Sequence, residues 1–212
     1  MLLTHIGHAE FRIETEGGVR IVTDPFDASC GYPLKQIEAD VALISHQHHD
    51  HNAVENLTGD PAMIDREGSY EPRPGVRVTA IQGFHDEVQG AKRGTTLLFL
   101  IETEGLRVVH LGDLGDRLSP EQEEILQSPD ILMIPVGGFY TIDGDQAAET
   151  AERLHARIIL PMHYKTQYNA DWPISGPEVF LKHFREADIC RGAEALRVAR
   201  GDLSCHPRVV LL

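Results

Sequence analysis

A run of histidines directly after a short apolar segment is the feature that most constrains this sequence. The residues Val41-Ala42-Leu43-Ile44 predict a buried strand. Four histidines and one aspartate follow within six residues, namely His46, His48, His49, Asp50 and His51. Imidazole and carboxylate groups together suit zinc and related transition metals. A solvated polar turn is the alternative, but imidazoles this close would repel one another on protonation if no metal were bound.

The geometry of the same loop suggests two metal ions rather than one. In an extended chain His46 and His48 point to the same side. After a turn, Asp50 and His51 can point to a second position a few ångströms away. We therefore predict that this loop contributes a pair of ligands to each of two cations.

Composition limits the kind of protein that carries this loop. The 212 residues are enough for one sizeable core, so we expect a single domain over 1–212. The net charge of −14 argues against nucleic acid and anionic membranes as partners. No secretory leader or membrane span is expected. The cysteines Cys30, Cys190 and Cys205 are odd in number and form no C-x-x-C pair, which favours reduced thiols and a cytoplasmic location.

The order of expected elements indicates a layered α/β fold. Strands are expected at 2–6, 11–15, 19–23, 41–45, 76–81, 95–101, 106–111, 131–136 and 157–161. Helices are expected to begin at Asn52, at Ser119, at Asp145 as the cap of 146–155, and at Ser175 for a helix through about residue 187. Meandering strands followed by alternating strands and helices predict helices outside two sheets.

Three later residues of ligand type each follow an expected strand. They are His85 in Gly83-Phe84-His85, Asp113 in Gly112-Asp113-Leu114-Gly115, and His163 in Pro161-Met162-His163. Taken singly, His85 is more often a surface histidine than a ligand, Asp113 could be a Gly-Asp turn residue, and His163 could be the capped end of a strand. Loops at the ends of neighbouring strands converge at one sheet edge, so together they are candidates to complete the site. The flanking glycines also let the Asp113 backbone approach another segment closely.

This ordered set resembles the metallo-β-lactamase superfamily. The resemblance covers nearly the whole chain and is nearest to the branch of ascorbate-phosphate-lactonase-like and uncharacterised metal-dependent hydrolases. It implies a four-layer αββα sandwich with the site at one edge of the paired sheets. It also implies the ligand sets: His46, His48 and His85 for one metal, Asp50, His51 and His163 for the other, and Asp113 bridging both.

Other polar residues are candidates for supporting roles. Asp24 is a candidate to orient a ligand histidine or, equally, an ordinary turn residue before Pro25. His8 is a pocket candidate, and Tyr140 and Lys165 are candidates to bind an anionic substrate. His110 is expected beneath the site, and His49 is a bystander or a donor behind the ligands. The remaining histidines, His5, His155, His183 and His206, are expected to be structural or at the surface.

The predicted function is hydrolysis by a metal-activated water, with Asp50 and Asp113 as catalytic residues. Zinc is the expected metal, with manganese or iron as alternatives. The expected substrate is a small ester, lactone or phosphodiester. Two alternatives stay open: a nuclease or RNA-processing phosphodiesterase with the same metal chemistry, and a non-catalytic metal-binding module.

Overall fold

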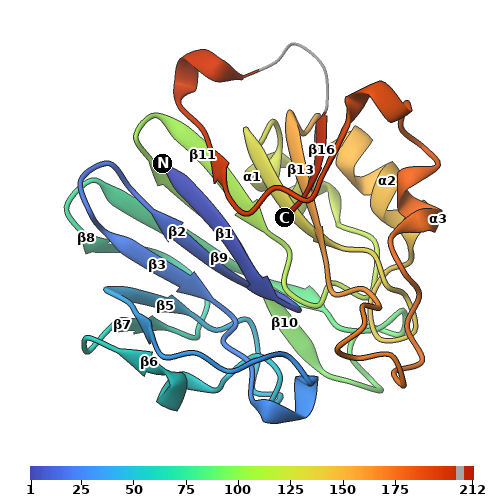
Figure 1. Cartoon of the computed structure of the whole chain (residues 1–212), viewed down its shortest axis with the longest axis horizontal. Coiled ribbons are helices and arrows are strands. Elements are labelled where there is room, and N and C mark those ends of the chain that lie inside the picture. Colours follow the sequence, from blue (N-terminus) through green and yellow to red (C-terminus); the bar gives the residue numbers. More distant parts are fainter. Residues whose placement is uncertain (204–207) are drawn as a thin grey trace.

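The computed structural model describes residues 1–203 and 208–212, which form two large sheets and a small third one (Figure 1). The first sheet has the order β15 (Leu196–Arg197), β1 (Leu2–Gly7), β2 (Glu10–Glu14), β3 (Arg20–Thr23), β5 (Val41–Leu43), β7 (Ala62–Ile64). The second sheet has the order β14 (Ile189–Arg191), β16 (Arg208–Leu211), β13 (Ile158–Met162), β12 (Ile131–Pro135), β11 (Leu106–His110), β10 (Thr95–Thr103), β9 (Val76–Phe84), β8 (Gly68–Arg73). Strands β4 (Ile37–Glu38) and β6 (Leu57–Thr58) form the small sheet.

The main core lies between the two large sheets. Alternate residues of the first sheet, such as Phe11 and Ile13 in β2, are buried against alternate residues of the second, such as Phe99 and Ile101 in β10. The intervening residue Leu98 faces a second apolar cluster on the other side of β10. This explains the nearly continuous apolar run in β10, because a strand covered on both faces has no solvent side to mark with polar residues.

The α-helices of the described chain cover the outer face of the second sheet. They are α1 (Pro120–Leu126), α2 (Gly144–Arg153) and α3 (Glu178–Leu181). Leu126, Ala147 and Phe180 place one residue from each helix in the outer apolar cluster with Leu98. In Figure 1, α2 and α3 lie on the right beyond β13, and β1 to β3 lie on the left. The predicted α/β sandwich is confirmed.

Helix starts follow the capping rules, with one correction. Ser119 caps α1 in a capping box with Gln122, as predicted. For α2 the predicted cap, Asp145, is wrong, because Asp143 accepts from the Gln146 backbone N–H and closes the capping box. Asp145 lies in the first turn instead, where a negative charge favours the helix dipole. No helix in residues 1–203 and 208–212 is long and apolar enough to cross a membrane.

Two other predicted helices are mostly absent. The Asn52 side chain donates to Gln47 instead of capping a helix, and only a 3-10 turn forms at Val54–Asn56. The helix expected from Ser175 is reduced to the four residues of α3, with a separate 3-10 turn at Glu186–Asp188. His206 and Cys205 lie outside the described residues.

Candidate metal centre

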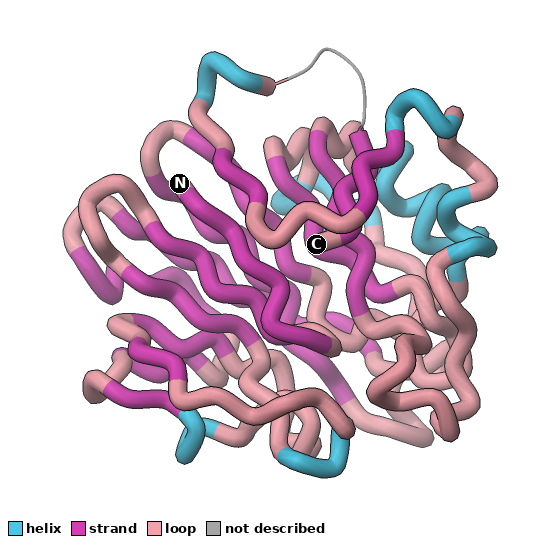
Figure 2. Tube along the Cα trace, viewed as in Figure 1, coloured by secondary structure: helices cyan, strands magenta, loops and turns pink. Residues whose placement is uncertain are grey.

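The predicted ligands come together at the ends of strands from both sheets. The loop after β5 carries His46 to His51, β9 ends directly before His85, Asp113 lies three residues after β11, and β13 ends directly before His163. Strands β11, β12 and β13 are mutually parallel, and β9 runs in the same direction because β9 and β11 are both antiparallel to β10. The loops of His85, Asp113 and His163 therefore leave the second sheet at the same edge. Figure 2 shows that loops, in pink, occupy much of the edge at which β1 and β13 end.

Asp113 lies at the centre of the cluster. Its Oδ2 atom is 3.2 Å from His163 Nε2, 3.3 Å from His51 Nε2, 3.4 Å from His85 Nε2 and 3.9 Å from His46 Nε2. The side chain of Asp113 is 2% exposed. One carboxylate therefore lies close to ring nitrogens of four histidines, which come from three loops.

The remaining distances divide the histidines into two groups. The first ligand set is His46, His48 and His85, whose ligand atoms lie within 4.8 Å of one another. The second ligand set is Asp50, His51 and His163, and His8 lies within the same 4.8 Å limit. Asp113 lies within this distance of two histidines from each set, which are His46 and His85 from the first and His51 and His163 from the second. This arrangement suits two cations with Asp113 between them.

The glycines beside Asp113 allow its close approach to neighbouring loops. Gly112 has φ +47°, and a Cβ there would lie 2.5 Å from Thr96 Oγ1. A Cβ on Gly115 would lie 2.4 Å from the carbonyl carbon of His85. Any side chain at these positions would push the Asp113 loop away from the β9 and β10 ends. The predicted close approach is confirmed.

Strained backbone marks three residues around the cluster. His8, Asp24 and His163 have φ values of +52°, +39° and +50°. Left-handed backbone is uncommon outside glycine and persists where the surrounding structure requires it. The backbone N–H of His163 donates to the carbonyl of His8 at 3.0 Å, which joins the β1 and β13 ends at the site.

Asp24 fixes the orientation of His51. It is fully buried, and its Oδ2 lies 3.0 Å from His51 Nδ1 and accepts from Ser45 Oγ at 2.8 Å. Its Oδ1 accepts from the Ser45 N–H at 2.7 Å. A proton on His51 Nδ1 leaves Nε2 free to face Asp113 and a metal, which is how a carboxylate behind a ligand histidine acts.

We expect Asp24→Asn to weaken metal binding by about 10- to 100-fold, because the amide is a poorer acceptor for His51 Nδ1–H. Competition for zinc with a chromophoric chelator measures the affinity. Asp60→Asn is the matched control, since Asp60 is exposed and also has left-handed backbone, at φ +59°. Equal affinities in the two variants would contradict this role of Asp24.

The buried carboxylate of Asp113 is negatively charged, which favours a bound cation. Burial alone would raise the pKa of Asp113, but His163 and His51 hold it well below its usual value. The pKa of His51 is raised well above its usual value, since Asp113 and Asp24 outweigh the effect of burial. For His46, burial and then the neighbouring His51 lower the pKa to about 3, which keeps its ring neutral and able to bind a metal.

Unpaired buried atoms point the same way. Within the described residues, Asp113 Oδ1, His46 Nε2 and His51 Nε2 are buried without a hydrogen-bond partner in the protein. Unsatisfied buried polar atoms are costly, and a bound ion is one of the few groups that resolves several at once. The residues present therefore fit divalent metal ions.

A cavity of about 450 Å³ opens onto the cluster. Its wall includes Tyr140, as expected for a substrate candidate, but not Lys165. It also includes Arg93 and Trp172, which were not among the predicted site residues. Weak signals existed for both: Arg93 lies between Gly90 and Gly94 in the loop that begins at His85, and Trp172 is the single tryptophan of the chain.

The other histidine candidates divide as follows. His8 is buried, and its Nε2 lies 3.2 Å from Asp50 Oδ2. His49 is exposed at the cavity mouth and contacts Ser29 Oγ at 2.9 Å. His110 lies beneath the site, where its Nε2 donates to the Ala9 carbonyl and its Nδ1 accepts from the Gly112 N–H. His110 thereby connects the turn at His8 with the turn at Asp113.

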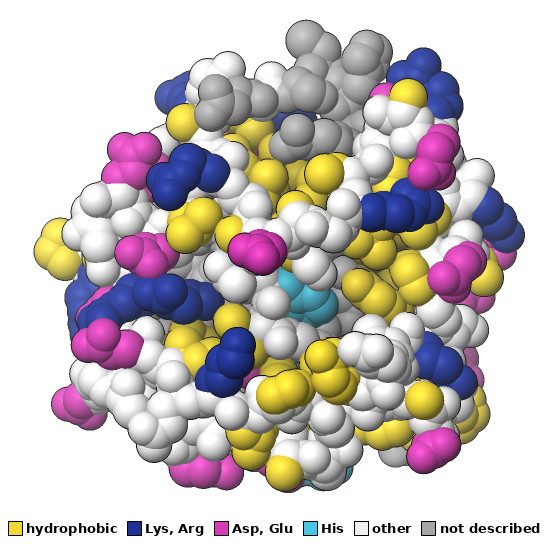
Figure 3. Space-filling model, viewed as in Figure 1, with side chains coloured by type: hydrophobic (Ala, Val, Ile, Leu, Met, Phe, Trp, Pro, Cys, Tyr) yellow, Lys and Arg dark blue, Asp and Glu magenta, His cyan; other side chains and the backbone are white. Residues whose placement is uncertain are grey.

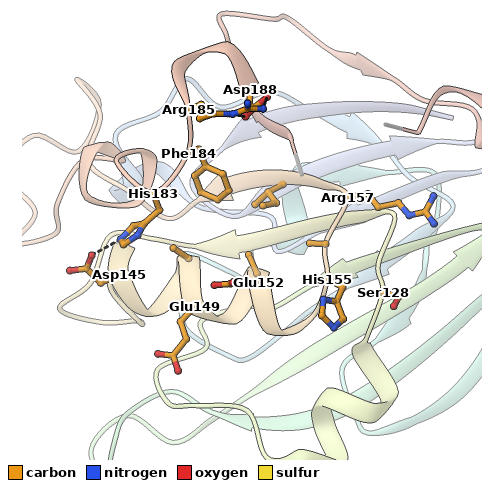
Figure 4. A pocket seen from close by; sticks show the side chains of 14 residues that line it. Ser128, Asp145, Glu149, Glu152, His155, Arg157, His183, Phe184, Arg185 and Asp188 are labelled. Carbon is orange, nitrogen blue, oxygen red and sulfur yellow. Dashed lines mark hydrogen bonds and ion pairs between the residues drawn. The ribbon is translucent and has the colours of Figure 1, made fainter. Parts of the chain in front are cut away.

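A larger hollow lies elsewhere, along α2 and the segment after α3 (Figure 4). Its volume is about 1050 Å³. His183 and Asp145 contact each other across it at 2.6 Å. Among the described residues, the groups able to hold a metal all lie in the cluster around Asp113, so the hollow is not the metal centre.

Comparisons with known proteins find related sequences over most of the chain. Residues 2–163 match the model of the beta-lactamase superfamily domain. A metal-dependent hydrolase of the UPF0173 family from Rubrobacter xylanophilus is 32% identical, over 88% of this chain and 90% of the relative. The corresponding protein of Methanosphaera stadtmanae is 30% identical, over 89% and 93%.

A solved structure is similar over almost the entire chain. It is that of a Thermotoga maritima protein named as a Zn-dependent hydrolase of the metallo-β-lactamase superfamily. The TM-score is 0.80 and the identity 38%, covering 99% of this chain and 97% of that one. Fold, site and relatives together define a metal-dependent hydrolase. The chain belongs to the metallo-β-lactamase superfamily.

Proposed function

We propose that the protein hydrolyses a small ester, lactone or phosphodiester with two divalent cations bound at the Asp113 cluster. The observation that carries the proposal is the position of Asp113 Oδ2, between 3.2 and 3.9 Å from four histidine Nε2 atoms of both ligand sets. Zinc is the proposed metal from the histidine-rich ligands, with manganese or iron as alternatives. Such a pair of cations would polarise the substrate oxygen and make a water acidic enough to react near neutral pH.

The residues of the chain have distinct tasks in this proposal. Asp113 would hold the cations together with both ligand sets. Asp50, held by His8 on one side and 3.6 Å from His51 Nε2 on the other, is the carboxylate that orients the attacking water. Tyr140 lies in the cavity wall, where its hydroxyl can donate to the developing negative charge of the substrate.

A serine nucleophile has no support. Ser45 precedes His46 and contacts its Nδ1 at 2.9 Å, but its hydroxyl donates to Asp24 and its side chain is buried. Ser45 therefore acts behind the ligands, where it holds His46 and Asp24, and a water is the nucleophile.

A small substrate fits better than a nucleic acid. The cavity volume of about 450 Å³ is in the range of small-molecule sites. Of the described residues in its wall, Arg93 is the single Lys or Arg, and Asp171 lies in the same wall. On the face seen in Figure 3, basic and acidic side chains are interspersed. A nuclease needs a basic track for the phosphate backbone, so this alternative ranks second. A cytoplasmic location remains our expectation from the cysteines.

The test is a panel of lactones, carboxylic esters, phosphodiesters and a single-stranded oligonucleotide, each with and without a chelator. We expect turnover of at least one small substrate, its loss on chelation, and its recovery when zinc is restored. Turnover that survives full metal removal, or turnover of the oligonucleotide alone, would contradict the proposal.

A further inference from the structure

Arg93 is a half-buried cation in the wall of the cavity that opens onto the cluster. Its guanidinium carbon lies 5.4 Å from the ring centre of Tyr140 and 5.9 Å from that of Phe139. Guanidinium groups stack on aromatic faces and keep their N–H edges free for other partners. The two rings therefore hold the Arg93 side chain in place without using its donors.

The loop that carries Arg93 is fixed by a buried carboxylate. Asp86 is 1% exposed and accepts from the backbone N–H groups of Val88, Gly90, Lys92 and Arg93, at 3.0, 2.9, 2.9 and 2.7 Å. The loop is closed by the His85 N–H, which donates to the Gly94 carbonyl at 3.1 Å. The same loop thus positions both a proposed metal ligand and Arg93.

The aromatic support is also built with backbone strain. Phe139 has φ +60°, which is rare for a bulky residue, and its side chain is 61% exposed. The Tyr140 N–H donates to the Gly138 carbonyl at 2.7 Å and tightens this turn. Exposing a large ring on a strained turn costs stability. The contact of the ring with Arg93 is a function that explains why the strained turn is kept.

The charge of Arg93 has no ion-pair partner within residues 1–203 and 208–212. Among the residues that the structure describes, no carboxylate forms an ion pair with it, although Asp50, Asp113 and Asp171 line the same cavity. The neighbouring Lys92, in contrast, pairs with Glu87 outside the cavity wall. In a chain of net charge −14, an unpaired guanidinium held in a catalytic cavity is suited to a ligand anion.

We infer that Arg93, supported by Tyr140 and Phe139, is an anion subsite for a carboxylate or phosphate group on the substrate, separate from the bond that is hydrolysed. Guanidinium recognises both groups through paired N–H donors. Trp172, whose ring lies 6.2 Å from Tyr140 and 5.3 Å from His8, supplies an apolar wall for the part of the substrate between the two ends. This inference rests on the proposed hydrolase function and narrows its substrate class.

The test compares three matched γ-lactones that carry a hydroxymethyl, a carboxylate or a phosphorylated hydroxymethyl group. The zinc-loaded variants Arg93→Gln and Arg93→Lys are compared with the wild type. We expect Arg93→Gln to lower kcat/KM for one or both anionic lactones by about tenfold or more, and for the neutral lactone by less than about twofold. For the anionic lactones, kcat/KM of Arg93→Lys should lie between the values of the wild type and Arg93→Gln, because lysine keeps the charge but lacks the paired N–H donors of guanidinium. The anionic lactone with the larger loss identifies the group.

Lys92→Gln is the control, because it removes the same charge from the same loop on a side chain that pairs with Glu87. It should leave kcat/KM for all three lactones unchanged. Thermal unfolding checks that each variant is folded. An equal loss for neutral and anionic lactones, or no loss for the anionic ones, would overturn the inference.

A binding measurement separates this inference from the proposed function. Calorimetry on the zinc-loaded protein should show that at least one of the anions methylphosphonate and acetate binds. The affinity for that anion should be about tenfold or more weaker in Arg93→Gln. If the wild type hydrolyses none of the lactones or other panel members, the proposed function fails, and this calorimetry still decides on Arg93. Unchanged affinity for both anions would overturn the subsite.

Discussion

Asp113→Ala is expected to lower kcat/KM for hydrolysis by about 1000-fold or more, which corresponds to several kcal/mol of lost transition-state stabilisation. The reason is the central place of this carboxylate, within 3.9 Å of Nε2 atoms from both ligand sets. Without it the proposed cations would lose their shared ligand, and four buried imidazoles lose their common counter-charge. Steady-state kinetics together with elemental analysis measure both consequences.

Controls separate this effect from misfolding. Asp113→Asn keeps the volume of the side chain and one carbonyl acceptor, and it should show a similar loss of activity with near-normal thermal unfolding. Asp116→Ala removes the same charge from the same loop, where the carboxylate accepts from the Arg117 N–H, and should leave activity within about twofold. Activity of Asp113→Ala within tenfold of the wild type would contradict the central role of Asp113.

Asp50→Ala is expected to lower kcat by about 100- to 1000-fold. Its effect on metal binding should be limited to one of the two ligand sets. Asp50 Oδ2 lies 3.2 Å from His8 Nε2 and 3.6 Å from His51 Nε2, so it belongs to the second ligand set alone. We expect about one equivalent of metal to be lost and the equivalent at the first ligand set to be retained. Kinetics and metal analysis on the same sample test this.

The retained metal is what distinguishes Asp50→Ala from Asp113→Ala. Glu55→Ala is its control, since Glu55 is an exposed carboxylate just beyond the same loop. Loss of both metals in Asp50→Ala would show that the two ligand sets are not separate. Full activity in Asp50→Ala would exclude Asp50 from the chemistry.

The residues that gather around Asp113 could be chosen from the sequence because each has a chemistry that few other roles need and follows a readable strand. His85 comes directly after β9, His163 directly after the buried strand β13 and Asp113 three residues after β11, and strands end at a sheet edge. Arg93 carries no such mark, because nothing local in Lys92-Arg93 tells which side chain faces the cavity. Its position depends on the four backbone donors gathered by Asp86, which is a tertiary arrangement.

The errors in the fold have similar causes. Asp143 and Asp145 are equally good caps by composition, and the folded chain forms the capping box between Asp143 and Gln146. The short edge strands β14 and β15 carry too few residues for a periodic signal. Strand β16 is defined by parallel pairing with β13 and β14, to partners far apart in the sequence. Composition and periodicity do not carry that information.

Anomalous diffraction from crystals of the zinc-loaded protein shows whether the chain holds two metal ions with Asp113 as their shared ligand. We expect two peaks, one among His46, His48 and His85 and one among Asp50, His51 and His163, each beside Asp113. A single peak, or peaks away from Asp113, would contradict this expectation.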